Sequence, residues 1–465
     1  MTRAKSYFFC GIGGSGMLPL AMIVQAQGAS VAGSDRSLDQ GRIADKFAYL
    51  QQHGITLFPQ DGSGITSADQ ILVTSAAIEE SVPDVQAARR IGAPHVTRPQ
   101  LLASLFNEAG TGIAVAGTSG KSTVTGMIAW ILHSLGRDPV AMNGAVMKNF
   151  VTPDTPFASA LAGKGDIFVS EVDESDGSIA LYEPKVAVLT NVTLDHKTME
   201  ELRGLFLDFL SKARVPILNI DDLEARSLAA RLIRREVTTF SLTDESADYS
   251  AGRIVEAPFA ISFEVNHWKS RCCIPVRLQV PGRHNVSNAL GAIAAVHACG
   301  IEVAAAAAAL AEFKGLRRRF ELVGEKNGIS VIDDFGHNPD KIAATLGTLH
   351  AFPGRLLVLF QPHGYGPLKV MGQQLIDCFV RNLRNEDVLI MPDPAYFGGT
   401  VDRSIGSAAI VAGVTAGGRH AEHIPDRAAA GARLKKLART GDRILIMGAR
   451  DDTLSTFAKE LVESL

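Results

Sequence analysis

Short runs of consecutive apolar residues alternate along most of the chain with longer stretches of mixed polarity. Strands that are apolar on both faces and separated by amphipathic helices are typical of parallel sheets covered on both sides. The pattern therefore predicts the α/β class. The runs that we expect to form buried strands are Ser6–Cys10, Ile71–Thr74, Ile113–Ala116, Ile167–Ser170, Val186–Leu189, Ile329–Asp333, Leu356–Phe360, Val388–Met391 and Arg443–Met447.

Two further segments have a pattern of their own. The segment Ala304–Ala309 predicts a helix, because alanine has the most favourable helix propensity. Between residues 250 and 280 the sequence is rich in β-forming residues but less regular, which predicts a small antiparallel extension.

The chain is expected to divide into three domains. A length of 465 residues suggests this number at about 150 residues per domain. Glycine-rich turns at Gly11 and Gly117 each open a nucleotide-binding type of unit, and a third series of strands follows the segment Lys314–Phe320. We expect boundaries near residues 108 and 314. Residues 1–108 and 314–465 would then form Rossmann-like domains, and 109–313 a central parallel sheet of the P-loop ATPase type.

Charge and composition exclude several classes of function. The 46 Lys and Arg residues against 49 Asp and Glu give a net charge of −3, which does not favour nucleic acid binding. No apolar run reaches the roughly 18 residues of a membrane span, and the start of the chain does not resemble a signal peptide. The five cysteines show no C-x-x-C spacing, so neither a disulfide framework nor a zinc knuckle is indicated. We expect a soluble cytoplasmic protein.

The first glycine turn, Gly11–Gly16, matches the pattern G-x-G-x-x-G between an apolar run and a predicted helix. Backbone N–H groups at such a turn can hold a pyrophosphate, and Asp35 follows at the place of a ribose-binding acid. The motif fits NAD and a UDP-sugar equally, since both carry a pyrophosphate and a ribose. A turn without any ligand is the alternative.

The second glycine turn, Gly117–Thr123, ends in the Gly-Lys-Ser of a phosphate-binding loop. Lys121 would reach the β- and γ-phosphates, and the Ser122 hydroxyl would be a ligand of Mg²⁺. The common pattern G-x-x-x-x-G-K requires glycine where this chain has Val115, so the loop is a shorter variant.

Acidic residues follow the predicted strand Ile167–Ser170. Glu171, Asp173, Glu174 and Asp176 cannot all be buried without partners, and at least one is well placed for Mg²⁺, which prefers oxygen ligands. A solvated acidic loop is the alternative. His196 follows the next strand and is a candidate for a second metal ligand.

Seven motifs, in order along nearly the whole chain, resemble those of the Mur ligase family, the ATP-dependent amide ligases that build the peptide of bacterial cell-wall precursors. They are GIGGSGM at 11–17, GTSGKST at 117–123, EVDESDGS at 171–178, TNVTLDH at 190–196, PGRHNVSNAL at 281–290, RRRFE at 317–321 and DDFGHNP at 333–339.

The resemblance implies roles for the three domains and for individual residues. The first domain would bind UDP-N-acetylmuramate or a similar nucleotide sugar, the second ATP with Mg²⁺, and the third an amino acid or peptide, in a monomer or homodimer. The implied sugar-nucleotide residues are Gly13, Gly14, Ser15, Gly16, Met17, Asp35, Thr74 and Ser75. The implied ATP residues are Gly117, Thr118, Ser119, Gly120, Lys121, Ser122, Thr123, Asn285, Asn288, Arg319 and Asp334. Ser122, Glu171 and His196 would bind metal.

The implied reaction activates a carboxylate with ATP as an acyl phosphate, which an amine then attacks. Lys121 and two Mg²⁺ ions would neutralise charge during phosphoryl transfer, with Glu171 and His196 as metal-binding catalytic residues. The amine must be deprotonated, so a base is expected near the third domain. His337 is the candidate, although a structural histidine at a strand end fits that position equally.

The chain departs from the family pattern in its third domain and at two positions near the phosphate loop. Gly364 and Pro367 stand where arginines are typical, and those arginines would hold the carboxylate of an amino acid. Lys369 could supply a point charge but not a bidentate contact. The amine therefore stays open between an amino acid such as L-alanine, a peptide of cell-wall recycling and another amine; a different acid or an NAD-dependent oxidoreductase are further alternatives. The other departures are Ser119, Thr198 and Asn338.

Overall fold

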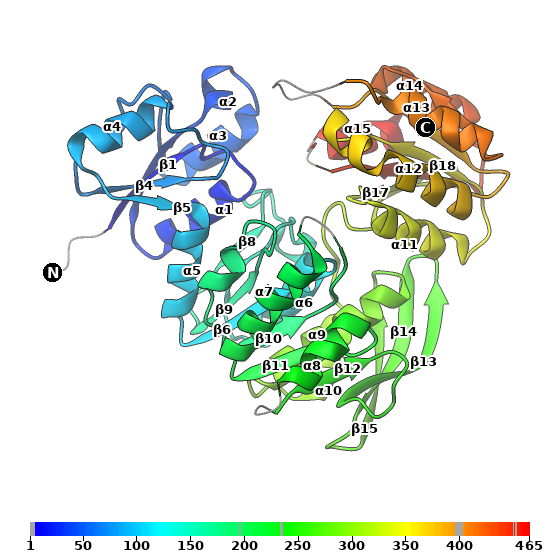
Figure 1. Cartoon of the computed structure of the whole chain (residues 1–465), viewed down its shortest axis with the longest axis horizontal. Coiled ribbons are helices and arrows are strands. Elements are labelled where there is room, and N and C mark those ends of the chain that lie inside the picture. Colours follow the sequence, from blue (N-terminus) through cyan, green and yellow to red (C-terminus); the bar gives the residue numbers. More distant parts are fainter. Residues whose placement is uncertain (1–4, 195–196, 233–235, 396–402, 450, 452) are drawn as a thin grey trace. The chain divides into compact units, whose positions relative to one another are not determined.

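A computed structural model describes residues 5–194, 197–232, 236–395, 403–449, 451 and 453–465 (Figure 1). Strands are present at all nine predicted apolar runs, and the predicted α/β class is confirmed. The described strands form three sheets, of five, ten and six strands.

The five-stranded sheet is parallel throughout and has the order β3-β2-β1-β4-β5. This order reverses between β1 and β4, whose ends Cys10 and Thr74 lie opposite each other. In open α/β sheets, ligands bind at such a switch point, beyond the carboxyl ends of the strands. The elements are β1 (Ser6–Cys10), α1 (Met17–Ala26), β2 (Ser30–Ser34), α2 (Arg36–Asp39), α3 (Ala44–Gln52), β3 (Thr56–Phe58), β4 (Gln70–Thr74), α4 (Pro83–Ile91), β5 (His95–Thr97) and α5 (Arg98–Glu108).

The ten-stranded sheet has the order β15-β14-β13-β12-β11-β10-β6-β9-β7-β8. Its strands from β13 to β7 pair in parallel, and β8 is antiparallel to β7. The strands are β6 (Thr111–Ala116), β7 (Val140–Met142), β8 (Ala160–Ala162), β9 (Ile167–Glu171), β10 (Val186–Leu189), β11 (Val215–Asn219), β12 (Thr238–Ser241), β13 (Tyr249–Ala257), β14 (Ala260–His267) and β15 (Cys272–Leu278).

The last three of these strands form the predicted extension. The links between them are the short segments 258–259 and 268–271, and links of this length connect antiparallel neighbours. Trp268 lies in the second link, and its side chain is 71% exposed.

Helices pack against the ten-stranded sheet, and their ends follow sequence signals. Thr198 and Glu201 form a capping box at the start of α7. The indole N–H of Trp130, on α6, donates a hydrogen bond of 2.8 Å to the carbonyl oxygen of Ala309, on the predicted alanine-rich helix α10. The elements are α6 (Lys121–Ser134), η1 (Lys148–Phe150), η2 (Ser178–Leu181), α7 (Met199–Lys212), α8 (Leu223–Arg231), α9 (Arg283–His297) and α10 (Val303–Leu310).

The five-stranded and ten-stranded sheets share one hydrophobic core. Phe106, on α5, is in ring contact with Phe168 of β9 and with Tyr182, at centroid distances of 5.7 and 5.1 Å. All three rings are almost fully buried. The first two glycine turns are therefore held on a common packed framework.

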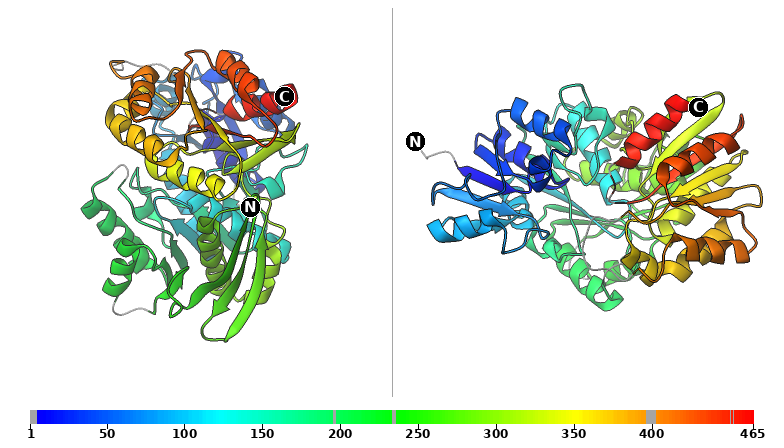
Figure 2. Two further views of the ribbon diagram at one scale, coloured as in Figure 1. Left: turned by 90° about the vertical axis from the view of Figure 1, so that its right-hand side faces the viewer. Right: turned by 90° about the horizontal axis from the view of Figure 1, so that it is seen from above.

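The six-stranded sheet has the order β16-β17-β21-β18-β19-β20, and only its edge strand β16 is antiparallel to its neighbour. Helices α11, α12 and α13 pack on one face, and α14 and α15 on the other (Figure 2). The elements are β16 (Glu321–Lys326), β17 (Ile329–Asp334), α11 (Pro339–His350), β18 (Leu356–Phe360), α12 (Tyr365–Asn382), β19 (Val388–Met391), α13 (Ser407–Ala416), β20 (Ala421–His423), α14 (Arg427–Leu437), β21 (Arg443–Met447) and α15 (Thr453–Ser464).

By their internal contacts, the residues form two compact units. The first includes both glycine turns and comprises Met1–Ile254, Ser262–Arg277 and His284–Lys314; the second comprises Val255–Ile261, Leu278–Arg283 and Gly315–Leu465. Among the described residues, no helix combines the length and the apolar character that crossing a membrane requires.

Candidate active site

The first glycine turn connects β1 to α1, as its pattern predicts. The N–H groups of Gly11 and Ile12 donate to the carbonyl oxygen of Ser34, at 2.8 and 3.0 Å, which fastens the turn to the end of β2. The carboxylate of Asp35 accepts from the N–H of Gly13 at 2.8 Å and from that of Ser37 at 2.7 Å. Asp35 is buried, so this carboxylate orients the turn. Its expected contact with a ribose stays a prediction.

The second glycine turn connects β6 to α6. Gly117 has φ +125°, and a Cβ at this position would lie 2.1 Å from the hydroxyl oxygen of Thr190, so only glycine fits. The Asn191 amide accepts from the Ser119 N–H at 3.0 Å and donates to the Ser119 carbonyl at 2.9 Å. The loop is thus fixed by the segment that follows β10, the neighbour of β6 in the sheet.

Lys121 is the first residue of α6, and its ammonium group has two partners. It donates to the carbonyl oxygen of Gly117 at 2.6 Å and to both carboxylate oxygens of Glu174, at 2.9 and 3.2 Å. The side chains of Lys121 and Glu174 are 19% and 7% exposed. The lysine therefore lies folded back over its own loop, where phosphate oxygens would meet its ammonium group.

Ser122 and Glu171 bring two oxygen atoms together beside Lys121. The Ser122 hydroxyl donates to Oε2 of Glu171 at 2.7 Å, and Asn143 holds the main chain there through a 2.9 Å hydrogen bond to the carbonyl of Ser122. A hydroxyl and a carboxylate are the hard oxygen donors that Mg²⁺ prefers.

The described residues contain no cluster of three or more His, Cys, Asp or Glu side chains arranged to hold a metal ion. The oxygen pair of Ser122 and Glu171 still fits Mg²⁺, because this ion is commonly held by one or two protein oxygens together with substrate phosphates and water. His196, the other expected ligand, lies outside the described residues.

Asp173 lies two residues beyond Glu171. Burial alone would raise the pKa of Asp173, but hydrogen bonds from Ser175 and the charges of Lys121 and Arg98 leave this pKa below its usual value. Arg98 also lies 3.9 Å from the carboxylate of Asp176. Lys121 and Arg98 therefore favour the ionised form of Asp173 and partly neutralise its charge.

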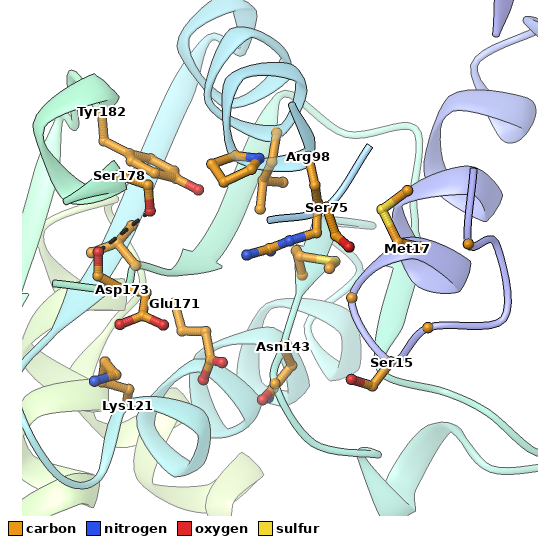
Figure 3. A pocket seen from close by; sticks show the side chains of 18 residues that line it. Ser15, Met17, Ser75, Arg98, Lys121, Asn143, Glu171, Asp173, Ser178 and Tyr182 are labelled. Atoms are coloured by element: carbon orange, nitrogen blue, oxygen red, sulfur yellow. Dashed lines mark hydrogen bonds between the residues drawn. The ribbon is translucent and has the colours of Figure 1, made fainter. Parts of the chain in front are cut away.

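A cavity of about 380 Å³ within the first unit joins the two glycine turns (Figure 3). Lys121 and Asp173 lie at one end, Ser15 and Met17 at the other, and Arg98 reaches in between them. The lining residues are Gly11, Gly14, Ser15, Gly16, Met17, Ser75, Arg98, Pro99, Leu102, Lys121, Met142, Asn143, Gly144, Glu171, Val172, Asp173, Ser178 and Tyr182.

The cavity includes four of the predicted residues of the first turn but, from the second turn, Lys121 alone; Gly117 to Gly120, Ser122 and Thr123 do not line it. Gly14 to Met17, Ser75, Lys121 and Glu171 line it. Gly13, Asp35 and Thr74 do not line it; the Thr74 hydroxyl lies 2.8 Å from Nε2 of His95.

Sequence reasoning missed several lining residues, of which Arg98, Asn143 and Tyr182 are the most prominent. Each is a single residue outside any glycine-rich or acidic motif. The one available signal was Arg98, a cation followed by Pro99, because proline is common in the first turn of a helix.

The predicted adenine-facing residues lie on α9, near the phosphate loop. Asn288 donates to the side-chain oxygen of Asn285 at 3.1 Å, and both side chains are buried. A Cβ at Gly120 would lie 2.6 Å from Oδ1 of Asn288, so this amide is directly beside the loop. Contact with adenine stays a prediction for both.

The remaining predicted residues belong to the second unit. The carboxylate of Asp334 accepts from the N–H groups of Phe320 and Gly336, each at 2.8 Å, and from the hydroxyl of Thr345 at 3.1 Å. The Arg319 guanidinium lies 4.4 Å from the centroid of the Phe335 ring. The expected roles of Asp334 and Arg319 with ATP stay predictions.

His337 follows β17 and is largely buried. Burial, together with the neighbouring charges of Lys341 and Arg319, lowers its pKa to about 3, and Nδ1 lies 2.9 Å from the carbonyl oxygen of Phe335. At neutral pH the ring is therefore uncharged. Such a ring can accept a proton, although its low pKa makes it a weak base.

Comparison with protein families gives three matches along the chain. The model described as "Mur ligase family, catalytic domain" matches residues 6–109, "Mur ligase middle domain" matches 115–296, and "Mur ligase, glutamate ligase domain" matches 318–450.

Individual proteins with these domains are similar over nearly their whole length. A UDP-N-acetylmuramate–L-alanine ligase from Paracoccus denitrificans is 34% identical, over 98% of this chain and 96% of its own length. The crystal structure of a UDP-N-acetylmuramate-alanine ligase from Thermotoga maritima aligns with a TM-score of 0.77 at 24% identity, covering 99% of this chain and 98% of that one. A murein peptide ligase from Psychrobacter arcticus aligns with a TM-score of 0.70 at 24% identity and the same coverage. The two structural matches show a shared fold.

Proposed function

Because the chain belongs to the Mur ligase family, we propose that it is an ATP-dependent ligase that joins the carboxylate of UDP-N-acetylmuramate to an amino acid, L-alanine first among the candidates. The bond formed is an amide, and ADP and phosphate are released. The reaction would supply a precursor of peptidoglycan in the cytoplasm, where both nucleotides are available.

The observation that carries this proposal is the cavity that runs from the first glycine turn to Lys121 and Glu171. A nucleotide sugar with its pyrophosphate at Gly14–Met17 would extend along the cavity, and its carboxylate would approach the phosphate loop. An oxidoreductase that uses only the first turn would leave the lysine and the oxygen pair at the far end without a role.

In the proposed reaction, residues of the first unit would position the phosphate groups and Mg²⁺. Lys121, which now contacts the Gly117 carbonyl and Glu174, would exchange the carboxylate of Glu174 for phosphate oxygens. Phosphoryl transfer depends mainly on positioning and on charge neutralisation. Ser122 and Glu171 would hold Mg²⁺, which supplies further positive charge to the phosphates when it is bound.

Two cavity residues that the sequence did not indicate would help to position the substrate and the phosphate loop. Arg98 lies beside Gly16, since a Cβ there would be 3.1 Å from Cδ of Arg98. Its guanidinium therefore lies between the pyrophosphate end and the acidic loop, where the sugar part of the substrate would pass. Asn143 orients the main chain of Ser122 through its amide.

The test is phosphate release by the purified protein with UDP-N-acetylmuramate, ATP, Mg²⁺ and one amine at a time. We expect release that depends on both the nucleotide sugar and the amine, with an amide product of the matching mass. A peptide in place of the amino acid is the second arm, because Gly364 and Pro367 leave the choice of amine open. Absence of amine-dependent release with every amine, or oxidation of NADH without ATP, would contradict the proposal.

A further inference from the structure

The second unit has a cavity of its own, at the amino ends of its parallel strands. Its volume is about 520 Å³, which lies within the usual range of small-molecule pockets. It is formed by the ends of α11 and α12 and by the segments that lead into β19 and β20. Asp334 and His337 follow the carboxyl end of β17, so this cavity lies at the opposite edge of the sheet from the predicted site residues.

Three arginines line this cavity from two separate segments of the chain. Arg381 and Arg384 lie at and just beyond the end of α12, and Arg419 lies shortly before β20. Among the described residues that line it, Glu386 is the one carboxylate. The cavity therefore has an excess of positive charge.

Other arginines of the same unit are neutralised by carboxylates. Arg355 lies 2.6 Å from Asp442, and Arg433 lies 2.7 Å from Glu422. In the part of the chain that the structure describes, the three cavity arginines form no such ion pair. Their charge is thus available to an anion from outside the chain.

Hydrogen bonds hold the guanidinium groups in place without using all their donors. Nη2 of Arg384 donates to the carbonyl oxygen of His350 at 2.6 Å. Nε of Arg419 donates to the carbonyl oxygen of Val380 at 2.8 Å, and its Nη1 donates to the side-chain oxygen of Asn385. These bonds leave Nε and Nη1 of Arg384 and Nη2 of Arg419 without a partner among the described residues.

The segment that carries Arg384 is fixed by the buried carboxylate of Asp387. This carboxylate accepts from the N–H groups of Leu356 and Arg384, at 2.8 and 2.7 Å. It also lies 2.8 Å from Nε2 of His350. Burial alone would raise the pKa of Asp387, but these hydrogen bonds leave it below its usual value. The negative charge of Asp387 thus already has its own partners.

A fourth guanidinium, that of the buried Arg443, lies close to the cavity residues. Its Nη1 donates to the carbonyl oxygen of Leu349, the residue before His350, at 2.5 Å. Burial lowers the pKa of Arg443, and the charge of Arg384 lowers it further, whereas that of Asp387 raises it. An anion in the cavity would relieve the repulsion between these guanidinium groups.

We propose that the cavity lined by Arg381, Arg384 and Arg419 binds a small molecule through a diphosphate group. Guanidinium groups bind phosphate oxygens through paired N–H donors. Three of them can together neutralise a group that carries several negative charges. An extended nucleic acid is not favoured, because the positive charge is confined to one cavity and the whole chain has a net charge of −3.

The test is isothermal titration of the full-length protein with inorganic pyrophosphate, at constant ionic strength and without Mg²⁺. The wild type is compared with the double variant Arg384→Ala, Arg419→Ala. Both substitutions lie outside the first unit, so the difference between the two proteins isolates this cavity. We expect the Kd of one bound pyrophosphate to rise at least tenfold in the variant.

Two further double variants serve as controls. Lys435→Ala, Lys436→Ala removes two exposed cations from α14 of the same unit, and its Kd should stay within twofold of the wild type. Arg384→Lys, Arg419→Lys keeps the charge but loses the paired donors, so it should bind with intermediate affinity. Because both arginines also bind main-chain carbonyls, a wild-type crystal soaked with pyrophosphate gives a second measurement that depends on no variant. We expect density beside Arg384 and Arg419.

Titrations with UDP distinguish the possible sources of the diphosphate. A larger difference between wild type and arginine variant for UDP than for pyrophosphate would assign a nucleotide, and an equal difference would assign the inorganic anion; both support the proposal. Equal pyrophosphate binding by the two proteins, an equal loss in the lysine control, or an empty cavity in the soaked crystal would overturn it. So would an RNA oligonucleotide that binds more tightly than pyrophosphate through the same arginines. None of these measurements requires turnover, so their outcome is independent of the ligase function.

Discussion

The two glycine turns of the first unit have the same local design but different side chains around them. Both follow a buried strand and both precede a helix, and the cavity extends from the first turn to Lys121 of the second. The first turn is held by the carboxylate of Asp35 and contains no cationic residue, although Lys46 Nζ donates to the carbonyl oxygen of Gly13 at 3.5 Å. The second is held by the neutral amide of Asn191 and carries Lys121 with an adjacent pair of oxygen donors.

We infer from this difference that the first turn binds substrate, whereas the second turn takes part in the reaction. Backbone N–H groups at a helix start can hold a pyrophosphate that does not react, and a carboxylate beneath them serves to fix their orientation. A phosphate that is transferred accumulates charge on moving oxygens, which requires a lysine and a metal ion. Substitutions around the first turn should therefore change substrate affinity, and those around the second turn should change turnover.

Lys121→Ala should have the largest effect. We expect kcat to fall by about 10³-fold or more, because the substitution removes the ammonium group that we propose as the partner of the γ-phosphate. The melting temperature should fall as well, because the substitution leaves the buried carboxylate of Glu174 without its cation, but a folded protein without turnover is the expected outcome. Lys269→Ala, which removes an exposed lysine paired with Glu236, is the control and should keep normal turnover.

Glu171→Gln should have the second largest effect, and magnesium should reveal it. The amide cannot supply the negative charge that Mg²⁺ prefers, so Mg²⁺ should bind more weakly. We expect the Mg²⁺ concentration that gives half-maximal activity to rise roughly ten- to a hundredfold, measured by titrating the ion at fixed ATP. Glu183→Gln, on the exposed loop before β10, is the matched control. An unchanged Mg²⁺ titration would show that Glu171 is not a ligand.

Asp35→Ala tests the first turn. The substitution removes hydrogen bonds from the N–H groups of Gly13 and Ser37. We expect the KM for UDP-N-acetylmuramate to rise about tenfold, which corresponds to the free energy that such hydrogen bonds usually contribute. The KM for ATP and kcat should stay within twofold. A fall in kcat with unchanged affinity would break the separation of binding from chemistry.

Glu174→Gln should have the smallest effect, and in the opposite direction. It removes the carboxylate that competes with phosphate for Lys121, so ATP should bind about threefold more tightly. Isothermal titration with a non-hydrolysable ATP analogue would measure this. Weaker binding would instead assign Glu174 to the metal or to the fold.

The sequence predicted the strands well because their signal is local. Runs such as Val186–Leu189 and Leu356–Phe360 are apolar on both faces, and this occurs mainly in covered parallel sheets. The glycine turns were predicted for a related reason, since each motif combines a strand end, glycines and a helix start within a few residues.

The remainder of the site could not be predicted, because it depends on contacts between distant segments. Arg98 and Asn143 lie in the cavity only because their sheets pack on a common core, and neither residue belongs to a glycine-rich or acidic motif. The sequence of the acidic loop indicated that one of its carboxylates would bind near the phosphate loop. It did not indicate which one, and in the structure Glu174 pairs with Lys121 whereas Glu171 contacts Ser122.

The chain has two tryptophans, and their surroundings differ in a way that provides an optical signal. Trp130 is on the helix that begins with Lys121 and is hydrogen-bonded to Ala309, whereas Trp268 is largely exposed. A soluble quencher such as iodide should suppress the emission of Trp268 more strongly than that of Trp130, which is partly buried. The remaining fluorescence would then come mainly from α6, without any label and in the unmodified protein.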